Sequence, residues 1–206
     1  MDYKEIIYKN YTSMNSLKSI PSALSKNLKR GHLYNYLINN FFPKNKNIKI
    51  LDIGCGYGDF VWFMLEKGYL NVVGIDNSKE MIYAGHKLGV SQILKDDIMN
   101  YLKHLPSNSY DVITAIDIIE HFKKEDLFKL IKEIYRVLNS NGLLITHQPN
   151  ADSPFVNSIL YGDYTHEQAF TKQSMSQLIL SNGFSSLKSY EVKPLIHGLK
   201  SFIRYL

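Results

Sequence analysis

The chain has 206 residues, 45% of them hydrophobic, which is enough for one substantial core and too few for two full enzymatic domains. The 24 Lys and Arg against 19 Asp and Glu leave a formal charge of +5, and the scattered lysines lack the basic stripe typical of nucleic-acid binders. A single cysteine, no start resembling a secretion signal and no apolar run of roughly 18 residues predict a cytoplasmic protein.

Strands and helices are expected to alternate along most of the chain. An apolar spacing predicts a helix at residues 25–42, which Pro43 and the polar residues after it end. The pattern then predicts strands at 48–53, 71–75, 92–94, 111–116 and 142–146, and helices at 59–67, 79–87 and 124–138. An irregular stretch at 151–169, a helix at 172–181 and a last strand at 187–192 follow. This order predicts an α/β fold, a doubly wound and mostly parallel sheet flanked by helices.

Three regions follow from this pattern. Residues 1–45 are predicted to form an N-terminal helical cap, and residues 46–193 a catalytic domain whose loop at about 148–171 is long enough to bind substrate. Residues 194–206 alternate apolar and basic side chains as an amphipathic tail does. The tail either packs on the domain itself or contacts a protein or the inner face of a membrane.

The first chemistry-bearing segment is the turn Gly54-x-Gly56-x-Gly58, directly after a predicted strand and before a predicted helix. Glycines allow a sharp turn and a close approach of the backbone to a ligand. Asp76 ends the next strand about twenty residues later, where a carboxylate can accept hydrogen bonds from ribose hydroxyls. A dinucleotide site shares both features, but its third glycine position holds Asp59 here.

Four ordered segments resemble the signatures of class I S-adenosylmethionine (SAM) dependent methyltransferases, namely residues 50–58, 73–76, 95–98 and 110–115. The resemblance implies a Rossmann-like fold with SAM as the cofactor. It further implies that the cofactor contacts Asp52, Gly54, Cys55, Gly56, Asp76, Asn77, Asp97, Ile98 and Ile116. Asp97 could instead cap a helix, and Asp52 could satisfy backbone donors of the turn. A class I sheet normally closes with a further strand, so the chain is expected to lack its last strand or to be part of a longer protein.

The second segment is Asp117-Ile118-Ile119-Glu120-His121, just past the fourth strand, where doubly wound sheets open their ligand crevice. It is similar to a segment in ubiquinone-pathway O-methyltransferases and small-RNA 2′-O-methyltransferases that forms part of a divalent-metal site. In the RNA enzymes a second histidine follows in a segment similar to the one around His166. That likeness implies a metal bound by Asp117, Glu120, His121 and His166, although those families have Glu where Asp117 stands.

Catalytic roles are expected for His166, His121 and Glu120, since methyl transfer to an alcohol needs positioning and a proton acceptor. A metal-free site with one histidine as the base is the alternative, and His147 ranks below the other two histidines for that role. A weak likeness of the tail to methyltransferases of bacterial surface-polysaccharide synthesis favours a sugar hydroxyl as the acceptor. A quinol or phenolic small molecule, an RNA 2′-hydroxyl, and a SAM-binding partner module without turnover remain open.

Overall fold

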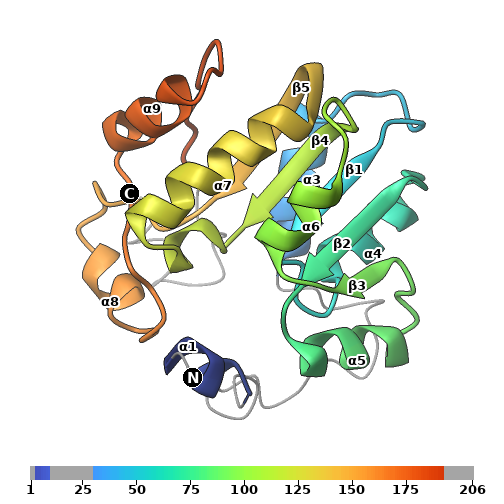
Figure 1. Ribbon diagram of the computed structural model, residues 1–206, viewed down its shortest axis with the longest axis horizontal. Coiled ribbons are helices and arrows are strands. Elements are labelled where there is room, and N and C mark those ends of the chain that lie inside the picture. The colour runs from blue at the N-terminus through green and yellow to red at the C-terminus, as the bar shows by residue number, and fades with distance from the viewer. Residues whose placement is uncertain (1–2, 10–29, 193–206) are drawn as a thin grey trace.

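The computed structural model describes residues 3–9 and 30–192, and the core of this part is one parallel sheet. The strand order is β3-β2-β1-β4-β5, so the first strand lies in the middle of the sheet and later strands are added on both sides of it (Figure 1). The strands are β1 (Ile50–Ile53), β2 (Val72–Asp76), β3 (Ile93–Lys95), β4 (Tyr110–Ile116) and β5 (Leu138–His147). The predicted doubly wound α/β fold is confirmed, and every strand pair is parallel.

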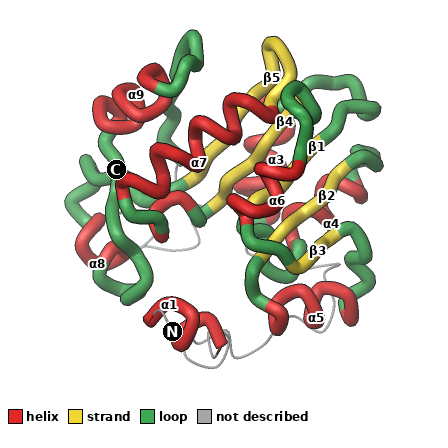
Figure 2. Tube along the Cα trace, in the orientation of Figure 1, coloured by secondary structure: helices red, strands yellow, loops and turns green. Residues whose placement is uncertain are grey.

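Helices cover both faces of the sheet (Figure 2). One apolar cluster joins the sheet to α3 (Gly31–Phe41), α4 (Asp59–Glu66) and α5 (Lys79–Lys87). The other joins it to α6 (Ile98–His104), α7 (Lys124–Val137) and α9 (Lys172–Ser181). Burial on both faces is what makes the strands nearly continuous in apolar residues.

The register of the central strands divides their side chains between these two clusters. Ile50 pairs with Val112 and both enter the cluster of α3 and α4. Leu51 pairs with Ile113 and both enter the cluster of α6 and α7. Because successive side chains alternate across a strand, a slip of one residue would exchange the two faces.

Two predictions about the elements are wrong. Residues 98–104 form α6, where the sequence predicted neither a helix nor a strand, because Ile98 and Leu102, one turn apart, are buried against α7 and the sheet. Residues 187–192 do not form a strand, since Lys188 and Tyr190 are exposed on one side and Ser189 on the other. Leu187 packs on the apolar cluster of α7 and α9 and Tyr190 on Phe41, but the segment does not pair with β5.

The strands all end at one edge, and the shorter elements gather there (Figure 1). A 3₁₀ turn, η1 (Ile119–His121), follows β4, and α8 (Val156–Leu160) lies in the predicted substrate loop. The N-terminal α1 (Tyr3–Lys9) reaches the same region, where Lys4 Nζ donates to the carbonyl of His121. The predicted tail at 194–206 lies outside the described residues, and within them no helix is long and apolar enough to cross a bilayer.

Candidate active site

The glycine turn between β1 and α4 is an open cradle. Gly54, Gly56 and Gly58 all have positive φ, at 71°, 55° and 81°, which L side chains rarely adopt. A Cβ on Gly56 would meet nothing within 4 Å, so its backbone faces empty space that a ligand can fill. A Cβ on Gly54 would lie 2.5 Å from Ile118, which shows how closely the turn packs against the segment after β4.

Asp76, at the end of β2, holds this turn in place. Its Oδ2 accepts a hydrogen bond of 2.9 Å from the Gly56 amide, and its Oδ1 accepts one of 2.7 Å from the Ser78 amide. Burial raises the pKa of this carboxyl above its ordinary value, against the effect of both hydrogen bonds. The predicted ribose acceptor therefore stands directly beside the glycine cradle.

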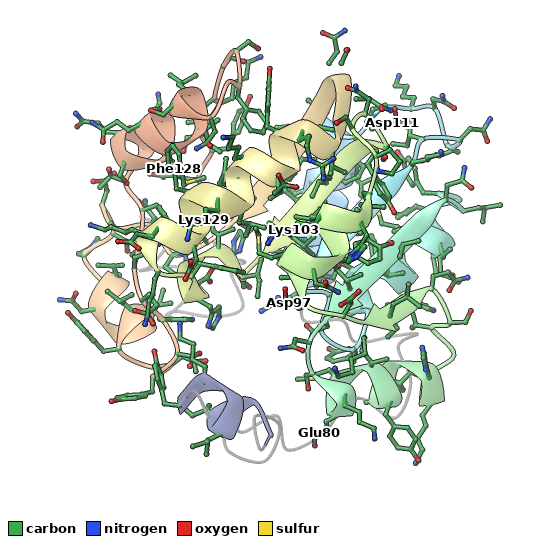
Figure 3. The ribbon with its side chains drawn as sticks, viewed as in Figure 1. Glu80, Asp97, Lys103, Asp111, Phe128 and Lys129 are labelled. Atoms are coloured by element: carbon green, nitrogen blue, oxygen red, sulfur yellow. The ribbon has the colours of Figure 1, made fainter. Side chains whose placement is uncertain are left out.

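All nine predicted cofactor residues line one large cavity along the carboxyl edge of the sheet. Asp97 begins α6 there (Figure 3), and its Oδ1 accepts from the Asn100 amide at 2.9 Å. It is thus the N-cap considered from the sequence, and it faces the cavity as well. Ile98 and Ile116 add apolar side chains to the wall of this cavity.

Asp52 is buried in this wall, 3% exposed, and accepts a hydrogen bond of 2.6 Å from the Thr114 hydroxyl on β4. This bond differs from the contact with backbone donors of the turn that the sequence left open. Burial raises the pKa of Asp52 to about 8, so the carboxyl is mostly protonated at neutral pH. Burial also raises the pKa of the Cys55 thiol, which makes Cys55 a packing residue rather than a nucleophile.

Three of the four predicted metal ligands come together. Ligand atoms of Glu120, His121 and His166 all lie within 4.8 Å of one another, and the two imidazole ring centroids are 4.6 Å apart. Glu120 and His121 lie on η1, and the loop carrying His166 is held there because the Glu120 carbonyl accepts from the amides of Glu167 and Gln168. Backbone hydrogen bonds thus bring His121 and His166, which are more than forty residues apart in the sequence, into one group.

Hydrogen bonds indicate the tautomer of both imidazoles. The Thr165 hydroxyl donates to Asp163, so it accepts from His121 Nδ1, at 2.8 Å. His166 Nδ1 is 3.1 Å from the Ile159 carbonyl, which can only accept. In the neutral rings the lone pair is therefore on Nε2 in both cases, and burial lowers the pKa of His121 to about 4, with help from nearby His166.

Glu120 completes this group as a buried carboxyl. Its side chain is 1% exposed, and Oε2 has no hydrogen-bond partner among the described residues. Burial raises the pKa of Glu120 to about 8, and the charge of Asp117 adds to that effect. A buried acceptor without a partner is costly, so this oxygen is suited to a ligand that brings positive charge.

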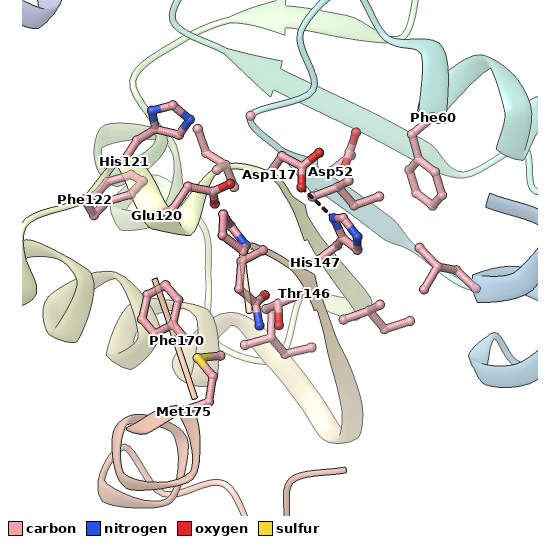
Figure 4. A pocket seen from close by; sticks show the side chains of 18 of the residues that line it. Asp52, Phe60, Asp117, Glu120, His121, Phe122, Thr146, His147, Phe170 and Met175 are labelled. Atoms are coloured by element: carbon pink, nitrogen blue, oxygen red, sulfur yellow. Dashed lines mark hydrogen bonds and ion pairs between the residues drawn. The ribbon is translucent and has the colours of Figure 1, made fainter. Parts of the chain in front are cut away.

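Asp117 does not join this group, in contrast to the prediction from the sequence. Its Oδ2 forms an ion pair of 2.8 Å with Arg30, and its Oδ1 is 2.5 Å from His147 Nδ1 (Figure 4). Burial acts to raise the pKa of Asp117, but the hydrogen bond from His147 and the charges of His147 and Arg30 lower it. The carboxylate is satisfied by these two partners, which explains why it is not directed at the histidine pair.

Arg30 was missed in the sequence. It stands at the N-cap of α3, twenty-four residues before the glycine turn, and no spacing rule connects it with the segment after β4. In the structure it lines the cavity together with Asp117 and His147. The predicted helix at 25–42 put Arg30 inside a helix and gave it no role in a site.

Comparison with known proteins supports the fold and the cofactor. Residues 27–189 match the family described as Methyltransferase domain. The chain is 25% identical over 200 residues to Phosphoethanolamine N-methyltransferase of Plasmodium falciparum, covering 92% of this chain and 68% of that protein. It is 35% identical over 111 residues to Ubiquinone biosynthesis O-methyltransferase of Pelagibacter ubique, covering 48% and 41%.

Other relatives are considerably longer than this chain. It is 30% identical over 145 residues to Phosphoethanolamine N-methyltransferase 1 of Arabidopsis thaliana, covering 68% of this chain and 29% of that protein. Among solved structures, a SAM dependent methyltransferase from Archaeoglobus fulgidus superposes with a TM-score of 0.69 at 24% identity, covering 91% and 76%. The family match spans well over half of the chain, and the predicted resemblance is confirmed. The chain belongs to the class I SAM-dependent methyltransferases.

Proposed function

We propose that this chain is an O-methyltransferase that acts on a small acceptor with two neighbouring hydroxyl groups, of which a sugar is the leading case. The observation that carries the proposal is the group of Glu120, His121 and His166 at the carboxyl edge of the sheet. This group shares its cavity with the glycine cradle, so an acceptor bound there is close to the methyl donor. SAM, when bound, supplies an activated methyl group on a sulfonium.

The three side chains fit a divalent metal ion. The donor set mixes nitrogen and oxygen. It consists of Nε2 of each imidazole, which carries the lone pair, and the unpartnered side-chain oxygen of Glu120. Such a set favours a first-row transition ion such as Mn²⁺, Fe²⁺ or Zn²⁺ over Mg²⁺. The ion would hold two adjacent oxygens of the acceptor and lower the pKa of one of them. His121 Nδ1 and His166 Nδ1, each held by an oxygen acceptor, would orient the rings toward it.

Acceptors with neighbouring hydroxyls include sugars as well as catechol-like quinols. A likeness at the sequence level to methyltransferases of surface-polysaccharide synthesis supports the sugar, preferably one destined for a bacterial surface glycan. The match to a ubiquinone-pathway enzyme supports the quinol as a second O-methyl acceptor. Phosphoethanolamine is a further candidate acceptor, since the Phosphoethanolamine N-methyltransferase of Plasmodium falciparum aligns with 92% of this chain.

The test offers labelled SAM to the purified chain with separate acceptor pools. These are nucleotide sugars and a cell-envelope glycan fraction, catechols and quinols, phosphoethanolamine, and short RNA. We expect a labelled methyl ether in the sugar pool, its loss on exhaustive chelation, and its return when Mn²⁺, Fe²⁺ or Zn²⁺ is restored. Label in phosphoethanolamine alone would overturn the O-methyl proposal, and SAM binding without product in any pool would indicate a partner module.

A carboxyl pair gives the matched control. Glu120→Gln removes the buried acceptor and should abolish the metal-dependent rate, while Glu125→Gln neutralises an exposed carboxylate in the first turn of α7 and should leave it intact. Both variants replace a carboxyl group by an amide of the same size, so a general effect of that replacement would appear in both. Full activity of Glu120→Gln after chelation would refute the metal site.

A further inference from the structure

We propose that His147 is the base that takes the proton from the acceptor hydroxyl, and that Asp117 is the residue that positions it. This inference rests on the proposed O-methyl transfer and adds the proton acceptor to it. The sequence ranked His147 below His121 and His166 for this role. The hydrogen bonds of the three histidines reverse that order.

The two other histidines are committed to a different task. In each of them Nδ1 lies against an oxygen acceptor, which leaves Nε2 as the nitrogen that can serve as a ligand in the group with Glu120. A nitrogen that coordinates a metal ion has no lone pair left for a proton. A metal-assisted transfer at this group therefore needs a base from another element.

His147 and Asp117 are fixed by two hydrogen bonds across the ends of neighbouring strands. The Asp117 amide donates to the His147 carbonyl at 2.8 Å, which extends the pairing of β4 with β5 by one residue. In the opposite direction, His147 Nδ1 donates to Asp117 Oδ1 at 2.5 Å. A base whose far nitrogen is held by a carboxylate is the arrangement that fixes the tautomer and stabilises the imidazolium.

The backbone conformation of Asp117 supports the same role. Asp117 has a φ of 52°, in the left-handed region, although most side chains avoid it. This conformation ends β4 abruptly and turns the carboxylate back over the end of β5, toward His147 (Figure 4). Non-glycine residues held in this region gather at functional sites, because the surrounding structure must offset the strain.

The charges around the pair suit a proton acceptor. Asp117 is shared with Arg30 from the N-cap of α3, so the ring and the guanidinium are both tied to one carboxylate. Asp52 lines the same cavity, and because burial raises its pKa to about 8 this carboxyl is mostly protonated near neutral pH. Within the described residues, His147 Nε2 has no hydrogen-bond partner, and the side chain remains 31% exposed toward the cavity.

These groups account for every bond and proton in the methyl transfer. As the acceptor oxygen forms its bond to the methyl carbon, the carbon–sulfur bond breaks and its electron pair stays on the sulfur. The proton of the hydroxyl passes to His147 Nε2, and the resulting imidazolium is stabilised by Asp117 Oδ1. The imidazolium then returns its proton to solvent through the exposed side of the ring.

The first test is spectroscopic and needs no acceptor. In ¹⁵N-histidine-labelled protein, the signal that disappears in His147→Ala identifies this ring, and we expect its neutral form to carry the proton on Nδ1. A proton on Nε2 would overturn the proposal, since that nitrogen could not then accept one. This readout distinguishes a failure of the pair from a failure of the proposed acceptor class.

The second test uses turnover of the accepted substrate. His147→Ala should lower kcat by about 10²-fold or more, which is the usual range for a lost general base, and added imidazole should restore part of it. Asp117→Asn tolerates the left-handed backbone but lacks the charge that stabilises an imidazolium, so kcat should fall at least tenfold with SAM affinity retained. His104→Gln, an exposed ring on α6, is the control and should keep the wild-type rate.

Two results would overturn the inference in an enzyme that does transfer methyl groups. One is a kcat of His147→Ala close to wild type. The other is a loss in His147→Ala that imidazole leaves unchanged while SAM affinity falls in parallel, which would mark a structural role. Absence of transfer by the wild type to every pool would instead remove the proposed function on which the inference rests.

Discussion

Gly85, in the last turn of α5, packs closely against the glycine turn, and Gly85→Ala tests that contact. In an ordinary helix interior this substitution stabilises by about 1 kcal/mol, because alanine has the higher helix propensity. Here the added Cβ would lie 3.0 Å from the Tyr57 carbonyl carbon, closer still to its oxygen, and against Ile93. Tyr57 lies inside the turn that forms the cofactor cradle.

The two effects can be compared. A backbone carbonyl cannot rotate away as the end of a side chain can, so the upper part of the usual overpacking cost applies, ~2–3 kcal/mol. It exceeds the gain in propensity, and we expect Gly85→Ala to lower the free energy of unfolding by about 1–2 kcal/mol. For a chain of this size that is a fall of roughly 2–8 °C in Tm. The turn must also shift, so the Kd for SAM should rise at least tenfold.

The assay combines urea unfolding with calorimetric titration of SAM. Gly56→Ala serves as the comparison, because its Cβ would meet no protein atom and would project into the cradle. It should therefore weaken SAM binding by obstruction and cost only about 1 kcal/mol of stability, from the left-handed backbone. An unfolding free energy of Gly85→Ala equal to or above wild type, with unchanged SAM affinity, would refute this account of the turn.

Three further variants probe the pocket and its supports. Because burial raises the pKa of Asp52 to about 8 from 3.8, the folded state keeps a proton that the unfolded chain loses. That contribution to stability is complete below the unfolded pKa and is lost as pH rises through about 8, so urea unfolding of Asp52→Asn should show a flatter pH dependence. Arg136→Met removes the hydrogen bonds to the carbonyls of Leu102 and Leu105 together with the ion pair to Glu133, and should lower the unfolding free energy by about 1–3 kcal/mol without changing SAM affinity. Lys4→Ala removes a donor to the His121 carbonyl, and steady-state kinetics should show a several-fold higher KM for the acceptor with SAM affinity unchanged.

For each of these variants, one result would contradict the expected effect. A pH dependence of Asp52→Asn as steep as that of wild type would assign the buried proton to another group. Retention of full stability in Arg136→Met would mean that solvent satisfies the two carbonyls. A higher SAM Kd in Lys4→Ala would place α1 over the cofactor rather than over the acceptor.

Much of the fold and of the cofactor pocket could be predicted from the sequence because the signals are local. Apolar strands, the glycine turn and Asp76 lie within thirty residues of one another, and the parallel sheet then brings their carboxyl ends to one edge. Asp97 and Ile116 follow at the ends of later strands and reach the same cavity. Site residues whose position follows from the end of a strand could therefore be predicted from the sequence.

The remaining features depend on contacts that no local pattern encodes. The short α6 buries only two side chains, so its seven residues carry too little periodicity to be predicted. Spacing placed Asp117 with Glu120 and His121, but the left-handed turn at Asp117 directs its side chain toward another strand. Arg30 reaches the same carboxylate from a distant helix.

The most direct test of the account is a calorimetric titration of the metal-free protein with Mn²⁺ and Zn²⁺. One ion should bind per chain, and Glu120→Gln, His121→Gln and His166→Gln should each weaken it, while Asp117→Asn should not remove it. Because burial holds a proton on Glu120, with a pKa of about 8, binding near neutral pH should release that proton and strengthen as the pH rises. Failure of either ion to bind, or equal binding in wild type and the three ligand variants, would contradict the proposed centre.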